Sequence, residues 1–234
     1  MVLSSRTDAG VHVRINGGIV DLDRELWSAL SPRKMIRAVD DRLDGAIAFL
    51  TVEEVERDFN PRMALHRVYR YRLEAMEFWK EPDHEAFNRW LSLFVGTYDA
   101  RNFARLEEGK NPIRTILSVT PWMDGNRLMG FEIKGEAFLW NQVRRVANAL
   151  FRLSVGDLEE DDVRTAIERP METVDFGVAP AQWLVLWGVA WDRAPLPAPT
   201  DEMGFSAPPT GRTAERTRKG RWQRAAQHLS LIHI

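Results

Sequence analysis

Residues Ser4–His12 read SSRTDAGVH, and they are the most informative segment of the chain. Taken by itself, an Arg-Thr-Asp-Ala-Gly run predicts a tight turn, since aspartate caps backbone N–H groups and glycine adopts positive φ without strain. Asp8 would be the capping residue and Gly10 the residue with positive φ. An isolated turn of this kind is usually only structural, so its meaning depends on the rest of the chain.

Four segments have apolar residues at helical spacing. The first follows Ser31-Pro32, a typical N-cap and first helical residue, and Gly96 and Gly156 are expected to end the second and third. The predicted helices are 32–43, 83–95, 138–155 and 160–168.

Strands are predicted between these helices. In Leu65–Leu73 the side chains alternate, so that Tyr69 faces one way and Arg70 the other. Residues 115–134 form a hairpin pattern around Asp124-Gly125. Short apolar runs predict further strands at 47–52 and 184–191, the second of them buried on both faces. Strands mixed with helices indicate an α+β or α/β fold.

Composition excludes several classes of protein. The 234 residues include no cysteine, which rules out disulfides and thiolate metal sites, and five scattered histidines argue against a metal centre. The chain has no apolar run of about 18 residues that could cross a membrane, and no signal peptide is expected. We therefore expect a cytoplasmic protein.

Basic residues gather in two segments although the net charge is only −2. Residues 57–72 hold five arginines against one aspartate, and 212–224 hold six basic residues against one glutamate. Such clusters attract phosphates, but charge alone also fits a solvated face followed by a disordered tail. The residues from 194 to 234 are rich in proline and then basic, and we expect them to be disordered and partly non-native.

Arg6–His12 resembles the signature loop of the TruA family of tRNA pseudouridine synthases, with seven consecutive matching residues. Val13 departs mildly from that pattern, which has a small residue there. Later matches follow in the same order: DFNPR (58–62) with YRY (69–71), GTYDARNF (96–103), PIRTI (112–116), GEAFLWNQVRR (135–145) and LVLW (184–187). Tyr98 and Ala100 replace a histidine and a phenylalanine of the family, and the Phe-Leu-Trp run is more like archaeal members.

The resemblance implies a pseudouridine synthase fold, a mixed and mostly antiparallel sheet flanked by helices, with two α/β halves around a central cleft. Residues 1–75 would be a truncated N-terminal half that carries the catalytic loop, and 76–193 the C-terminal half. Family members also carry a first strand, a Y-D-G-x-x-F-x-G-W-Q segment and a helix ahead of the motif, which this chain is expected to lack.

The activity implied is isomerisation of uridine to pseudouridine at positions 38–40 of the tRNA anticodon stem-loop, by a homodimer and without cofactor or metal. Asp8 matches the catalytic carboxylate, which acts as a nucleophile at C1′ or abstracts a sugar proton. Arg144 matches the arginine that pairs with it, and Tyr69 the tyrosine that stacks under uracil and takes the C5 proton. The expected substrate-binding residues are Arg6, Thr7, Gly10, His12, Arg70 and Phe138, and Arg57, Arg62 and Arg67 are weaker candidates for phosphate contacts.

Two other readings compete with this one. Without the N-terminal segment the chain could be an inactive fragment that retains only RNA binding, because the family sheet would lose a strand. A nucleosidase could also use Asp8 to break a glycosidic bond, but such hydrolysis usually needs two acidic groups, and no second acid stands in a comparable motif.

Overall fold

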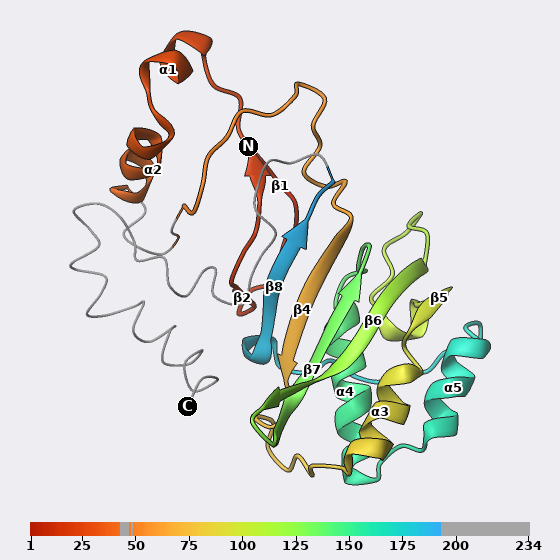
Figure 1. The fold of residues 1–234 in the computed structure, drawn as a ribbon. Helices are drawn as coiled ribbons and strands as arrows, with labels where there is room; N and C mark the ends of the chain where they lie inside the picture. Colours follow the sequence, from red (N-terminus) through yellow and green to blue (C-terminus); the bar gives the residue numbers. More distant parts are fainter. Residues whose placement is uncertain (43–46, 48, 193–234) are drawn as a thin grey trace. The chain divides into compact units, whose positions relative to one another are not determined.

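A computed structural model describes residues 1–42, 47 and 49–192 (Figure 1). The expected tail over 194–234, with its basic segment, lies outside the described residues. The chain divides into two compact units. Of the described residues, the first takes in 1–5, 17–63 and 191–192, and the second takes in Arg6–Asn16 and Ala64–Ala190. The signature loop therefore belongs to the second unit, although it lies near the start of the chain.

A six-stranded mixed sheet forms the centre of the second unit, with the strand order β2-β8-β4-β7-β6-β5. Only β2 and β8 pair in parallel, and every other neighbouring pair is antiparallel. The predicted mixed and mostly antiparallel α+β fold is thus confirmed. The strands are β2 (His12–Val13), β4 (His66–Arg72), β5 (Gly96–Asp99), β6 (Ile113–Asp124), β7 (Arg127–Gly135) and β8 (Leu184–Ala190).

Strand β4 lies in the middle of this sheet and alternates as predicted. Tyr69, Tyr71 and Leu73 are all less than a tenth exposed. Arg70 and Arg72 are only partly buried and point to the opposite face. Because the pattern has a period of two, it fixes which face of the sheet packs against the core.

The predicted hairpin is present as β6 and β7, which turn at Asp124–Arg127. Gly130 of β7 lies where the hairpin meets β4. A Cβ atom built on it would lie 1.9 Å from the backbone oxygen of Tyr71, so only glycine fits there. This close approach lets β4 pair with β7 across six residues.

Three helices gather on one side of the six-stranded sheet: α3 (His84–Ser92), α4 (Gln142–Val155) and α5 (Glu160–Glu168) (Figure 1). The apolar face of α4 is fully packed, with Val146, Ala147 and Leu150 at 0% exposed. Two 3₁₀ turns, η1 (Arg101–Phe103) and η2 (Ala181–Trp183), complete this unit. In η1, Phe103 stacks on Phe176 with ring centroids 4.7 Å apart. The core of the unit therefore lies between the sheet and α4.

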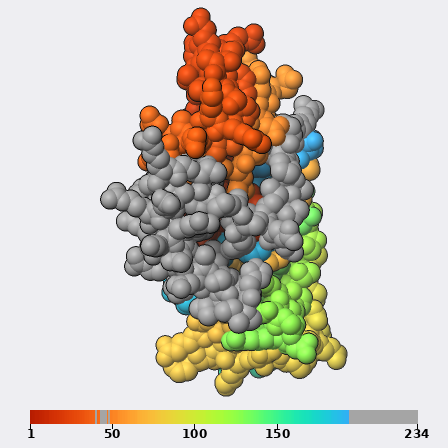
Figure 2. Space-filling view, turned by 60° about the vertical axis from the view of Figure 1, so that its left-hand side comes forward, coloured from red at the N-terminus to blue at the C-terminus, as the bar shows by residue number. Residues whose placement is uncertain are grey.

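The first unit holds α1 (Arg24–Ala29), α2 (Pro32–Asp40) and a two-stranded ribbon of β1 (Val2–Leu3) and β3 (Gly18–Ile19). Figure 2 shows the described N-terminal residues of this unit in red to orange. Ser31 caps α2 as predicted, accepting a hydrogen bond from the Lys34 N–H. Among the described residues of this unit, Met35 is the one large apolar side chain that is buried.

Three local predictions were wrong. Residues 49–52 have no regular structure, so the strand expected at 47–52 is absent there, while residue 48 lies outside the described residues. Gly96 does not cap α3, which ends at Ser92; it opens β5. Helix α4 begins at Gln142 and not at Phe138, because Asn141 has a left-handed φ of 63° that cannot continue a helix toward its N-terminus.

None of the described helices is both long and apolar enough to cross a membrane.

Candidate active site

The signature loop forms a tight turn at the edge of the sheet. The Val11 N–H donates to the backbone oxygen of Asp8 at 3.1 Å, and Gly10 adopts a φ of 89°, as its place in the turn requires. Directly afterwards, His12 and Val13 pair with Val185 and Leu186 of β8. The strand pairing therefore anchors the loop that carries Asp8.

Asp8 and Arg144 form an ion pair although they are 136 positions apart in the sequence. The distance from Nη1 of Arg144 to Oδ2 of Asp8 is 3.1 Å. Both side chains are partly buried, the arginine at 18% exposed and the carboxylate at 33%. Charge-assisted hydrogen bonds of this kind are stronger than neutral ones, so the guanidinium holds the carboxylate in place while leaving part of it open to solvent.

Arg144 is itself held by two further acceptors. Its Nε donates to the backbone oxygen of Ala179 at 2.7 Å, and its Nη1 also donates to Oδ1 of Asn141 at 3.1 Å. The Ala179 N–H in turn donates to the backbone oxygen of Arg144 at 3.1 Å. The neighbouring Arg145 points elsewhere and pairs with Asp175 at 2.5 Å. One arginine of the two is therefore aimed at Asp8.

Residues 176–181 form a strap along α4 that sequence reasoning missed. Besides Ala179, the strap contributes the backbone oxygen of Pro180, which accepts from the Tyr71 hydroxyl at 2.9 Å. Burial raises the pKa of Tyr71, which keeps that hydroxyl protonated and able to donate. The Phe176 oxygen accepts from the Asn148 side chain at 2.5 Å. Because the strap acts through backbone oxygens, no residue type marks it in the sequence.

Tyr69 lies beneath a second aromatic ring. The ring of Phe138 meets it edge to face with centroids 5.2 Å apart. Tyr69 is 8% exposed, whereas Phe138 is half-buried. Phe138 therefore presents the more accessible ring of the pair. Phe138 also belongs to the loop that ends at Asn141, the side chain of which binds Arg144.

Arg70 lies on the other face of the sheet, so the structure does not bring it to Asp8. Its Nε pairs with Glu132 at 2.7 Å, and its guanidinium lies 3.9 Å from the ring centroid of Trp187. His12 shares a row with Arg70, because both pair with Val185. The alternation that buries Tyr69 sends these two side chains away from it, so we do not include them in the candidate site.

Arg6 and Thr7 are exposed just before Asp8, and among the described residues their side chains form no ion pair or hydrogen bond. Arg67, a weaker candidate for phosphate contacts, is 8% exposed and donates to the backbone oxygen of Glu136 at 2.5 Å. Burial lowers the pKa of this guanidinium. Its role is to hold the loop that follows β7, so it is not a candidate for a phosphate contact.

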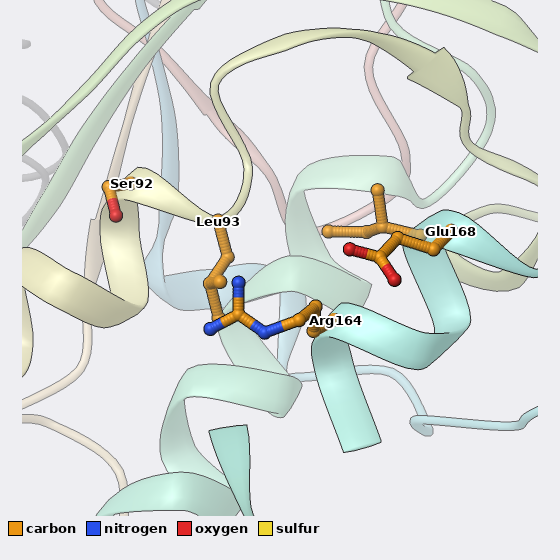
Figure 3. A pocket seen from close by; sticks show the side chains of 5 residues that line it. Ser92, Leu93, Arg164 and Glu168 are labelled. Carbon is orange, nitrogen blue, oxygen red and sulfur yellow. The ribbon is translucent and has the colours of Figure 1, made fainter. Parts of the chain in front are cut away.

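A hollow of about 250 Å³ lies away from these residues, between the end of α3 and α5 (Figure 3). Ser92 and Leu93 line one side of it and Arg164 and Glu168 the other. None of the predicted site residues lines it. In the part of the chain that the structure describes, no three histidine, aspartate or glutamate side chains gather as metal ligands would.

Fold and site together define an α+β protein with one carboxylate, on a loop at the sheet edge, fixed by one helical arginine. Comparison with known proteins narrows this class. A family model described as tRNA pseudouridine synthase matches residues 91–192.

Curated relatives match over most of the chain. A protein named tRNA pseudouridine synthase A from Methanoculleus marisnigri is 32% identical over 201 residues, which cover 85% of this chain and 68% of that protein. Proteins of the same name from Methanocorpusculum labreanum and Thermococcus kodakarensis are 31% and 34% identical, over 83% and 80% of this chain and 64% and 66% of theirs.

This chain belongs to the tRNA pseudouridine synthase family. The expected likeness to archaeal members is confirmed by these three relatives. The chain spans about two thirds of the length of the curated relatives it matches.

Proposed function

We propose that the protein isomerises uridine to pseudouridine in the anticodon stem-loop of tRNA, at positions 38–40, with Asp8 as the catalytic carboxylate. The observation that carries the proposal is the 3.1 Å pair between Asp8 and Arg144, in a chain of this family. The names of the relatives support tRNA as the substrate, and the carboxylate of Asp8 is the group that would act on the ribose. We further propose that the protein works as a cytoplasmic homodimer.

The reaction breaks the N1–C1′ bond of uridine and forms a C5–C1′ bond. The proton on C5 passes to a base, for which the resemblance suggests Tyr69, and N1 gains a proton, so atoms and charge balance without an oxidant or a second substrate. Asp8 either attacks C1′ directly or removes a sugar proton on the way to a glycal. In both routes the carboxylate must lie beside the ribose, and the hydrogen bond from Arg144 restricts its position.

Uracil needs a flat surface while it turns, since an aromatic face holds a base in any rotation. The more accessible ring of Phe138 would provide this surface, and Tyr69, which meets it edge to face, would lie at its side. The uridine must leave its stem-loop stack first, which costs a few kcal/mol that contacts to the flipped nucleotide offset. We propose that Arg6, exposed two residues before Asp8, fills the space left in the RNA and binds a phosphate. Thr7 and Gly10 would line the same loop.

Substitution of Asp8 by asparagine tests the proposal. We expect Asp8→Asn to abolish pseudouridine formation in a tRNA transcript, while binding of that tRNA stays within about threefold of wild type. Pseudouridine is read by its chemical adduct as a stop in reverse transcription, which also gives the position modified. Turnover close to that of wild type would refute the role of Asp8. RNA binding without turnover in the wild-type protein would favour the alternative, an inactive RNA-binding fragment.

Arg144→Ala tests whether Arg144 positions Asp8 for the reaction or contributes to the affinity for tRNA. Because Arg144 bonds Asp8 directly, we expect turnover to fall at least about a hundredfold while the Kd for tRNA changes little. Arg145→Ala is the matched control, since that neighbour pairs with Asp175 and should leave turnover unchanged. A variant Arg144→Ala that lost only affinity would show that the pair with Asp8 is not catalytic.

A further inference from the structure

Trp140 is a large aromatic side chain that the fold leaves in solvent. It lies in the loop 136–141 between β7 and α4 and is 42% exposed. Most aromatic side chains of the second unit are buried, and among its described residues Phe78 is the other one classed as exposed. Exposing an indole ring forgoes hydrophobic stabilisation, so a position next to the site invites a functional explanation.

The ring of Trp140 is held in a fixed position. The Arg105 N–H donates to the backbone oxygen of Trp140 at 2.8 Å, an isolated antiparallel bridge between the loop and the segment after η1. The guanidinium of Arg105 lies 4.3 Å from the ring centroid, stacked over one face. In the part of the chain that the structure describes, Arg105 has no carboxylate partner, so its N–H groups remain available to an anion.

The loop that carries Trp140 is the same loop that builds the candidate site. Phe138, two residues earlier, packs on Tyr69, and Asn141, the next residue, binds Arg144. Two residues span at most about 7 Å of chain. Adjacent nucleotides of a single strand are separated by a comparable distance, so a base on Trp140 and a uridine at Phe138 would be near neighbours in one RNA.

We propose that Trp140 and Arg105 form a binding platform for one nucleotide of the RNA, next to the target uridine. A base stacks on the indole and the guanidinium binds the adjoining phosphate. Sequence-tolerant RNA recognition uses such stacking on aromatic rings and arginine planes, and a guanidinium fork suits phosphate geometry. The assignment of this nucleotide as the target's neighbour rests on the proposed function; the platform itself does not.

Binding measured in the Asp8→Asn protein tests the platform without turnover. The probe is a synthetic anticodon stem-loop RNA, and the readout is its Kd at several salt concentrations. We expect Trp140→Ala to raise the Kd about tenfold or more, and Trp140→Phe to stay within about threefold because an aromatic face remains. Arg105→Gln should raise the Kd and reduce the slope of log Kd against log salt by about 0.7.

Phe78→Ala is the matched control, because it also removes an exposed aromatic ring. Phe78 is 76% exposed and lies in the loop that follows the C-terminal end of β4. This variant should bind RNA as wild type does. A thermal melt checks that each variant folds. If Trp140→Ala does not fold, the Kd values of Arg105→Gln and Trp140→Phe test the platform instead. An unchanged Kd in Trp140→Ala and Arg105→Gln overturns the platform, and loss of self-association instead of RNA binding would identify a protein interface.

The platform and the proposed function fail in different ways. If wild type makes no pseudouridine but Trp140→Ala still weakens RNA binding, the platform stands and the activity does not. If wild type is active and Trp140→Ala keeps its Kd and its KM, the activity stands and the platform is wrong. Photo-crosslinking of a stem-loop RNA that carries 5-iodouridine beside the target, followed by peptide mapping, should place the crosslink on Trp140.

Discussion

At the scale of single residues, Asn141 does two things that few side chains can do together. Its backbone has a left-handed φ of 63°, which asparagine tolerates better than most residues. Its Oδ1 accepts from the same Nη1 of Arg144 that binds Asp8. With one hydrogen of this nitrogen directed at Asn141, the other is left for Asp8. We therefore regard Asn141 as a positioning residue for the ion pair.

Replacing Asn141 separates these two contributions. Asn141→Ala removes the acceptor and puts alanine in a left-handed conformation, whereas Asn141→Gly removes the acceptor but relieves the strain. A hydrogen bond to a charged group contributes about 1.5–3 kcal/mol, so we expect kcat to fall about tenfold or more in both variants, with KM little changed. Both variants lose this hydrogen bond and should lower the Tm, and Asn141→Ala should lower it further because of the strained alanine. Wild-type kcat in Asn141→Gly would show that Asn141 does not orient Arg144.

The residues of the candidate site differ in how far the sequence predicts them. The run Arg6–His12 is contiguous and specific, so the sequence alone is enough to single out Asp8. Its pairing with Arg144 is implied by the resemblance and is present in the fold. Arg70 is expected at the site because it belongs to the YRY run that resembles the family, yet the period of two in a strand sends the side chains of Tyr69 and Arg70 to opposite faces. The alternation predicted for β4 therefore already implies that Arg70 faces away from Tyr69.

At the scale of elements, the hairpin β6–β7 offers two glycines in contrasting environments. A Cβ at Gly130 would lie 1.9 Å from the Tyr71 backbone oxygen and 2.8 Å from the Leu73 nitrogen, whereas one at Gly125 in the turn would meet nothing within 4 Å. Both have positive φ, 155° and 55°. Both values disfavour a residue with a Cβ atom, but only Gly130 also lacks the space for one.

We expect Gly130→Ala to destabilise the protein by at least about 3 kcal/mol, since the clash is with backbone and must separate β4 from β7. Gly125→Ala should cost only about 1 kcal/mol, the strain of a left-handed alanine. Urea unfolding followed by circular dichroism measures both. Equal losses in the two variants would mean that the backbone at Gly130 shifts freely to accept a methyl group.

Elements with a strong period are predictable from the sequence, and irregular ones are not. The hairpin follows an apolar pattern of period 2, α5 one of period 3.6, and β8 is a continuous apolar run, and the predicted bounds of all three are nearly correct. The strap 176–181 has no such pattern and binds through backbone oxygens of Ala179 and Pro180. The apolar pattern places the start of α4 too early, since the φ of Asn141 is a tertiary property set by its loop.

At the scale of the whole molecule, the two units differ sharply in how much apolar surface they bury. Among the residues that the structure describes, the second unit holds nearly all the buried apolar side chains, including five phenylalanines at 0–1% exposed. In the first unit Met35 is the one large apolar side chain buried among the described residues, and several others are exposed: Val2, Leu3, Val20, Leu22, Leu26, Ile47, Phe49 and Met63. Apolar burial is the main favourable term in folding, so the units must differ in local stability.

Amide hydrogen exchange should reveal this difference directly. Helix α1 has no buried residue, so its backbone hydrogen bonds open by local fraying. Its amide hydrogens should therefore exchange within the first seconds to minutes. We expect α2 to behave similarly, while amides of β4, β7 and α4 exchange orders of magnitude more slowly because they open only with the core. Met35→Ala should speed exchange in α2 and leave β4 unchanged. Protection of α1 and α2 equal to that of β4 would contradict this expectation, and a dependence of that protection on protein concentration would attribute it to self-association.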